Sequence, residues 1–189
     1  MDILRIVIKK NKLAIVSQAS RLQSHHMSVK KIFGPLYLLK NILYKNASKA
    51  KLPSKISNKL ICRPTLNAGI FAIAKDAPHW ERLRYWQKFL INNKRIRLFT
   101  TTQLALGIIS YHENLAYEAL PEICNYMGPY RWSTDLNLFI DYYAPYEAVS
   151  IIHMVAQDRM RENKKYKIKI LDDKDNFIQK SLRYSENIN

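Results

Sequence analysis

The stretch Leu66–Ile73 reads LNAGIFAI, an apolar run that a polar residue and a glycine interrupt. Asn67 carries both a donor and an acceptor in its amide, and Gly69 permits close backbone approach or a positive φ angle. A plain buried strand needs neither residue. We therefore predict a strand at about 66–74 whose end meets a ligand. A buried strand that begins with a turn is the alternative.

Other segments also have the pattern of strands. The runs at 13–16 and 149–152 predict short buried strands, and the second of these ends at His153. The segment 117–120 also predicts a strand. The alternating residues and polar turn within 165–184 are typical of a β-hairpin.

Three segments have apolar residues at helical spacing. A basic amphipathic helix is predicted at 32–51, a second helix is predicted after an Asp76 N-cap, and Thr100 or Thr101 is expected to cap a third. The second and third helices are expected to bury Trp80, Leu83, Trp86, Phe89 and Leu90, and Leu104, Ala105, Ile108 and Ile109. This order of strands and helices predicts an α/β fold with a partial sheet.

A chain of 189 residues can bury a core, and we expect a single domain over 1–189. Within it we expect a basic N-terminal third (1–60), a core (61–160) and a C-terminal hairpin (165–184). No apolar run reaches the ~18–20 residues that span a bilayer, and the N-terminus lacks the pattern of a signal peptide. Two cysteines do not make a disulfide framework. These features predict a cytoplasmic protein.

The net charge of +16 is unevenly spread. Residues 1–60 hold 13 Lys and Arg against one acid, Asp2, which indicates an anionic partner: nucleic acid, anionic lipid or a phosphorylated sugar. Composition bias is the alternative, since Lys, Asn and Ile are abundant throughout. The aromatic residues fall at core spacing and are not interleaved with the basic run, which argues against nucleic acid. The helix at 32–51 could lie on a membrane surface or pack against the core.

Few polar residues stand where an α/β sheet binds ligands. His153 could ligate a metal, touch a phosphate or be structural. Gln103 could face an anion or a sugar hydroxyl, or be an ordinary helical residue. Asp173 and Asp175 have D-x-D spacing, but turn chemistry explains them without a metal. Four glycines in the whole chain exclude a Gly-rich phosphate cradle.

Four segments in order resemble a known family. They are LNAGIFA (66–72), TTQLAL (101–106), LPEICNY (120–126) and IIHMVA (151–156). Their order and spacing resemble the C-terminal half of a GT-A-type nucleotide-sugar glycosyltransferase, similar to family 8 enzymes, over roughly residues 12–184. The resemblance implies a partial GT-A-like α/β sheet with flanking helices. It also implies a hexosyltransferase-like activity that moves a sugar from a nucleotide diphosphate to an acceptor hydroxyl.

On the donor side, the resemblance implies that Asn67, Ala68 and Gly69 line the sugar pocket. Thr102 stands there too, at a position where the family has an acid. Gln103 is the implied catalytic residue, in contact with the transferring sugar near its anomeric carbon.

On the other side of the implied reaction, Asn125 would support the acceptor, a sugar or a lipid-linked molecule. His153 is similar to the family's C-terminal metal ligand, beside a Mn²⁺ or Mg²⁺ on the diphosphate. Arg159 is the candidate for the basic residue that meets this diphosphate, although the family's Lys-Pro-Trp pattern is missing.

The family's D-x-D metal motif precedes the Asn-Ala-Gly segment, but residues 1–65 contain only one acid, Asp2. One histidine cannot hold a hard cation, which needs several oxygen ligands. We therefore expect an N-terminally truncated transferase with little or no activity alone. The alternatives are a basic module that binds anionic lipid or nucleic acid, peripheral to a membrane in the first case, and a remnant without function.

Overall fold

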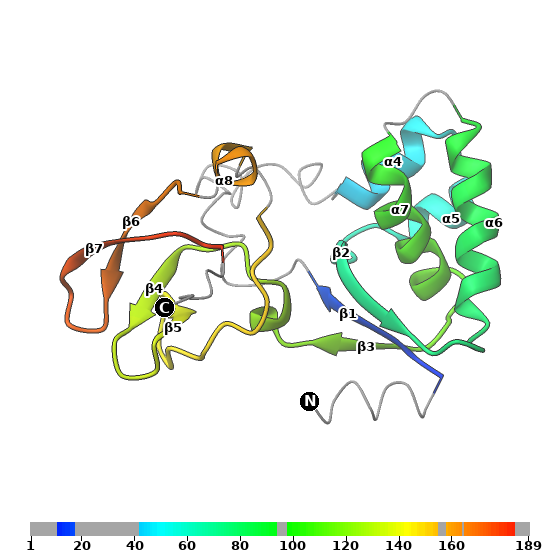
Figure 1. Cartoon of the computed structure of the whole chain (residues 1–189). Coiled ribbons are helices and arrows are strands. Elements are labelled where there is room, and N and C mark those ends of the chain that lie inside the picture. The colour runs from blue at the N-terminus through cyan, green and yellow to red at the C-terminus, as the bar shows by residue number, and fades with distance from the viewer. Residues whose placement is uncertain (1–10, 18–41, 94–97, 155–157, 164, 184–189) are drawn as a thin grey trace. The chain divides into compact units, whose positions relative to one another are not determined.

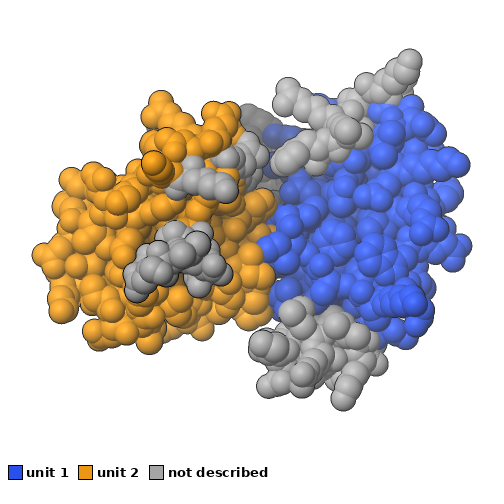
Figure 2. Space-filling model, in the orientation of Figure 1, with its two compact units in different colours: residues 1–120 blue, residues 121–189 orange. Residues whose placement is uncertain are grey.

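The computed structural model describes residues 11–17, 42–93, 98–154, 158–163 and 165–183. Internal contacts divide the chain into two compact units, residues 1–120 and 121–189 (Figure 2). The predicted single domain with its basic third, core and hairpin stays a prediction. The first part of the helix predicted at 32–51 lies outside the described residues.

The first unit contains a three-stranded sheet in the order β2-β1-β3 (Figure 1). The central strand β1 (Leu13–Ser17) is antiparallel to β2 (Leu66–Ile73) and parallel to β3 (Tyr117–Leu120). Leu13 and Ile15 are fully buried, as expected for a central strand. The three strands predicted in this part of the sequence are confirmed.

Helices pack together on one side of this sheet (Figure 1). They are α4 (Ile42–Lys49), α5 (Ser54–Lys59), α6 (His79–Ile91) and α7 (Leu98–Tyr111). The helix α7 lies at the centre, since β2, α4 and α6 all contact it. Its predicted core residues are all buried: Leu104, Ala105, Ile108 and Ile109.

The helix starts differ from the prediction. The N-cap position of α6 is Pro78, without a side-chain cap, and Asp76 lies in a turn that the Ala77 N–H closes on the Ala74 carbonyl (3.1 Å). The helix α7 begins at Leu98, so Thr100 and Thr101 lie inside it. A threonine hydroxyl can cap a helix or hydrogen bond to the backbone inside one, so the two threonines alone do not locate the start of the helix.

The buried face of α6 is narrower than predicted. Leu83, Trp86 and Leu90 are buried at spacings of three and four residues, which is one helical stripe. Trp80 and Phe89 are 39% and 46% exposed. The prediction of a core position was wrong for both, because they flank this stripe. The Trp80 indole instead donates a hydrogen bond to the Ala74 carbonyl (3.0 Å).

The second unit contains a four-stranded sheet in the order β5-β4-β6-β7. The strand β4 pairs antiparallel with β5 and parallel with β6, and β6 and β7 form the predicted antiparallel hairpin. The strands are β4 (Tyr130–Ser133), β5 (Leu138–Asp141), β6 (Ile168–Asp172) and β7 (Phe177–Lys180). Two short helices accompany them, the 3₁₀ helix η2 (Glu122–Asn125) and α8 (Asp158–Glu162). The protein is therefore mixed α/β with two small mixed sheets.

The segment 149–152 is not the buried strand that its apolar residues predicted. It makes a single isolated bridge, between Ile152 and Tyr126, and Ile151 is 41% exposed. The apolar run is too short to distinguish a ladder strand from a segment that pairs at one point. None of the described helices is long and apolar enough to cross a membrane.

Replacement of Leu43 by Ala should destabilise the first unit by about 3 kcal/mol, because Leu43 is fully buried and its loss leaves a cavity against α7. A Cβ on Gly107 of α7 would lie only 3.0 Å from Leu43 Cδ1, which shows how closely α4 approaches this helix. Ile42→Ala on the same helix is the control, since Ile42 is 55% exposed. Denaturant unfolding measures both, and equal midpoints for the two variants would contradict the assigned packing.

Candidate functional site

The predicted donor-side residues lie at an irregularity of β2. Ile15 of β1 opposes Phe71, so a regular antiparallel ladder would place Ser17 opposite Gly69, but Ser17 opposes Leu66. The surplus residues of β2 form a bulge, and bulges are common next to functional sites. Asn67 is 1% exposed, and its carboxamide oxygen accepts the Gly69 N–H at 2.9 Å. The polar residue and the glycine therefore mark a break in the strand ladder, with Gly69 exposed.

Two further predicted residues, Thr102 and Gln103, lie on α7, which packs against β2. The Thr102 hydroxyl accepts a hydrogen bond from the Gln87 amide (3.0 Å), which ties α6 to α7. Gln103 is half-buried in the second turn of α7, because this helix begins at Leu98 and not after the predicted Thr100 or Thr101 cap. The first unit thus places all five donor-side residues on two elements that pack together.

In the second unit, backbone hydrogen bonds place Asn125 and His153 on adjoining segments. The Tyr126 N–H donates to the Ile151 carbonyl (2.9 Å), and the His153 N–H donates to the Tyr126 carbonyl (2.8 Å). The N–H of Ile151 also donates to the Ile123 carbonyl of η2 (3.1 Å). The segment that ends at His153 is therefore fixed against the end of η2, where Asn125 stands.

The Asn125 side chain is unusual for a buried group. It is 2% exposed, and neither its amide nitrogen nor its carbonyl oxygen has a hydrogen-bond partner in the described part of the chain. A buried amide without partners costs about 1–3 kcal/mol, and most such groups in native proteins are satisfied by protein, water or ligand. Within the described part of the chain, the Asn125 amide therefore has hydrogen-bonding capacity that no side chain or backbone group meets.

A buried tyrosine holds the chain next to Asn125. The Tyr126 side chain is fully buried, and its hydroxyl lies 2.9 Å from an Asp141 carboxylate oxygen and 2.7 Å from the Pro129 carbonyl. The same hydroxyl accepts the Tyr142 N–H at 3.0 Å. Burial raises the pKa of Tyr126 well above its usual range, so the hydroxyl keeps its proton.

The metal and diphosphate candidates have less support from their surroundings. His153 is half-buried, and Arg159 is exposed on α8. No group of three or more His, Cys, Asp or Glu side chains that could hold a metal occurs among the described residues. A hard cation needs several oxygen ligands, so a site built on His153 alone does not fit Mn²⁺ or Mg²⁺.

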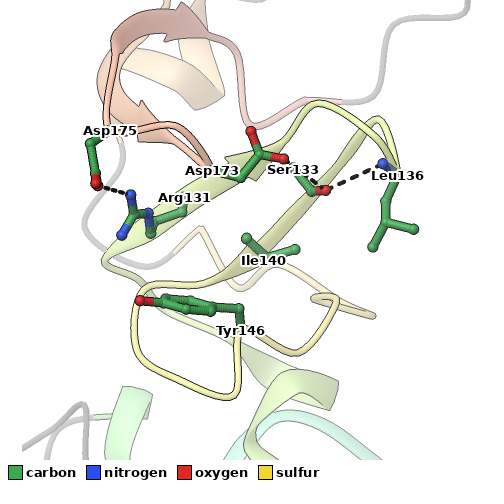
Figure 3. Close-up of a pocket in the computed structure, with 7 residues that line it drawn as sticks. All are labelled: Arg131, Ser133, Leu136, Ile140, Tyr146, Asp173 and Asp175. Atoms are coloured by element: carbon green, nitrogen blue, oxygen red, sulfur yellow. Dashed lines mark hydrogen bonds and ion pairs between the residues drawn. The ribbon is translucent and has the colours of Figure 1, made fainter.

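Sequence reasoning missed a pocket of about 270 Å³ in the second unit (Figure 3). Its lining residues come from β4, β5, their connections and the β6–β7 turn: Arg131, Ser133, Leu136, Ile140, Tyr146, Asp173 and Asp175. Asp173 and Asp175, whose D-x-D spacing is visible in the sequence, are among them, and the residues of the implied sugar, acceptor and metal sites are not. The strands β4 and β5 were not predicted, so nothing in the sequence indicated that these residues meet.

The polar groups of this pocket largely bond one another. Arg131 pairs with Asp175, donates to the Asp172 carbonyl (2.8 Å) and lies over the Tyr146 ring at 5.5 Å. Asp173 accepts hydrogen bonds from the backbone and hydroxyl of Thr134 (both 2.8 Å). The D-x-D carboxylates thus anchor the turn to Arg131 and Thr134, and the turn's own backbone bonds go to Asp172, whose carboxylate accepts the N–H groups of Lys174 and Asn176.

The pH dependence of stability should contain a contribution from His153. Burial lowers the pKa of its imidazole below the usual ~6.5, so the unfolded chain binds the proton more readily. The contribution of neutral His153 to stability is therefore complete above the pKa of His153 in the unfolded chain. It declines as the pH falls toward the lower pKa of His153 in the folded protein. We expect His153→Gln to show a shallower loss of stability between about pH 7 and pH 5 in urea titrations. Parallel curves for both proteins would contradict the assigned burial.

No protein-family model matches the chain, no curated protein matches its sequence, and no solved structure matches its fold.

Proposed function

We propose that this chain is a glycosyltransferase-like domain that binds sugar and, by itself, transfers little or none of it. The proposal rests on the ordered resemblance to family 8 enzymes and on one structural observation, the buried amide of Asn125, which has no hydrogen-bond partner among the described residues. The intact relatives implied by the resemblance move a sugar from a nucleotide diphosphate to an acceptor hydroxyl. We also propose that the chain has part of the GT-A-like sheet of these enzymes.

The chemistry of Asn125 suits a sugar hydroxyl. A hydroxyl both donates and accepts, and a carboxamide offers one group of each kind. Both groups of Asn125 are buried without partners in the described chain, so a hydroxyl that reached them when the site opened would recover hydrogen bonds that the fold leaves unmade. The resemblance assigns this residue to the acceptor side, where an acceptor presents its hydroxyl.

The bulge of β2 supports the donor side of the proposal. Gly69 is exposed at the point where β2 leaves its regular pairing, and it has no side chain to keep a ligand away. The adjacent Asn67 amide is held by its bond to the Gly69 N–H. A backbone corner of this kind can position a sugar ring, and the helix that carries Gln103 packs against the same strand.

Turnover would require a group that stabilises the departing diphosphate. In enzymes similar to family 8, a bound metal has this role. The acids needed for their upstream metal motif do not occur in residues 1–65, apart from Asp2. We therefore propose binding without efficient transfer.

Purified protein should release no nucleotide diphosphate above background when incubated with uridine- and guanosine-diphosphate sugars and Mn²⁺. We expect no release because residues 1–65 lack the carboxylates that would bind the Mn²⁺. Release is measured by a coupled nucleotide assay, with a boiled sample as the control. Metal-dependent release that increases with protein concentration would contradict the proposal.

Asn125→Leu should abolish sugar binding without loss of stability. Leu has a similar size and removes a buried amide that no described group hydrogen bonds, so the free energy of unfolding should stay equal or rise by about 1 kcal/mol. Ligand-observed NMR with free hexoses and nucleotide sugars measures binding, and thermal unfolding measures stability.

Asn93→Leu is the matched control, because the Asn93 amide donates to the Ala50 carbonyl at 2.7 Å. The free energy of unfolding of this variant should fall by about 1 kcal/mol, and the variant should still bind the sugars. If Asn125→Leu binds the sugars as the original protein does, or if the original binds none of them, the proposed site is wrong.

A further inference from the structure

The hairpin formed by α4 and α5 exposes lysines and no acids. Five lysines between residues 42 and 59 are exposed: Lys45, Lys49, Lys51, Lys55 and Lys59. None of them forms an ion pair with an acid in the described part of the chain. The sequence contains no Asp or Glu between Asp2 and Asp76, so no nearby acid along the chain can offset this charge.

The lysines are arranged in rows. Lys45 and Lys49 are four residues apart on α4, and Lys55 and Lys59 are four apart on α5, so each pair lies on one helix face. Like charges at this spacing repel each other. An anionic partner that contacts either pair would relieve this repulsion on that helix.

The hairpin is a fixed part of the first unit. Its apolar side chains Leu43, Ala47 and Leu52 are buried in the core, and the Leu52 N–H donates to the Ala47 carbonyl (3.1 Å) at the turn. The Ala50 carbonyl also accepts the bond from Asn93, just beyond α6. The lysines therefore project from a rigid surface whose orientation the core sets.

We propose that this lysine surface, residues 42–59, docks the protein on an anionic lipid membrane. Lysine ammonium groups are compact point charges, and a field of anionic headgroups attracts such clusters without a defined bonding geometry. Nucleic-acid surfaces typically add arginine forks and exposed aromatic rings for stacking. The hairpin has no arginine, and its one aromatic residue, Tyr44, is half-buried.

The apolar face of the hairpin is committed to the core, so the association is electrostatic and does not require insertion. Binding should therefore weaken steeply with salt, because the exposed lysines are fully accessible to screening. It should also depend on the headgroup charge rather than on the acyl chains.

The test is co-sedimentation of the full chain with phosphatidylcholine vesicles that contain about 30 mol% phosphatidylserine, at low and high salt. A quadruple variant should bind the phosphatidylserine vesicles at least about tenfold more weakly. It carries Lys45→Gln, Lys49→Gln, Lys55→Gln and Lys59→Gln. The control carries Lys88→Gln, Lys165→Gln, Lys167→Gln and Lys174→Gln, the same charge change at exposed lysines elsewhere. It should bind within about twofold of the original protein.

Two double variants, one for each helix, keep the test valid if the quadruple variant unfolds. Each double variant should bind the vesicles with an affinity between those of the original protein and the quadruple variant, and its unfolding midpoint should stay unchanged. Equal binding by the quadruple variant and its control would overturn the proposal, as would equal binding to vesicles of phosphatidylcholine alone. Binding to duplex DNA that the hairpin substitutions abolish, with no binding to vesicles, would also overturn it and assign the surface to nucleic acid.

Discussion

The burial of α7 is the constraint on which the first unit depends. Leu104, Leu106 and Ile108 are fully buried on this helix, so it must be covered from several directions. The strand β2 and the helices α4 and α6 supply that cover. Gly107 lets α4 approach closely, because any side chain there would meet Leu43. The same packing holds β2, which carries the Asn-Ala-Gly bulge, against the helix that carries Gln103.

The second unit depends on a different kind of contact. The Tyr126 hydroxyl joins Asp141, Pro129 and the backbone of Tyr142 in a buried cluster. Next to this satisfied cluster stands Asn125, whose amide has no described partner. A fold that satisfies one buried polar group so fully and leaves its neighbour unsatisfied gives up stability at one position, which is typical of binding sites. This contrast is the physical basis of the proposed sugar site.

The two proposals concern separate properties and can fail separately. Sugar recognition depends on directional hydrogen bonds from a buried amide, and these are insensitive to salt. Membrane docking depends on exposed charge, which salt screens. A domain with both properties would suit an acceptor that is itself attached to a lipid, since docking raises the local concentration of such an acceptor.

The sequence by itself determined the elements with strong local patterns. The strands around Leu13 and Ala119, the core face of α7 and the C-terminal hairpin follow from periodicity, and the lysine excess follows from composition. Tertiary structure alone decided that Trp80 and Phe89 face outward, that 149–152 pairs at one point, and that Asn125 is buried without a hydrogen-bond partner among the residues that the structure describes. Local patterns record which residues can be buried. Only the packing of distant segments decides which positions the core covers and which polar groups find a partner.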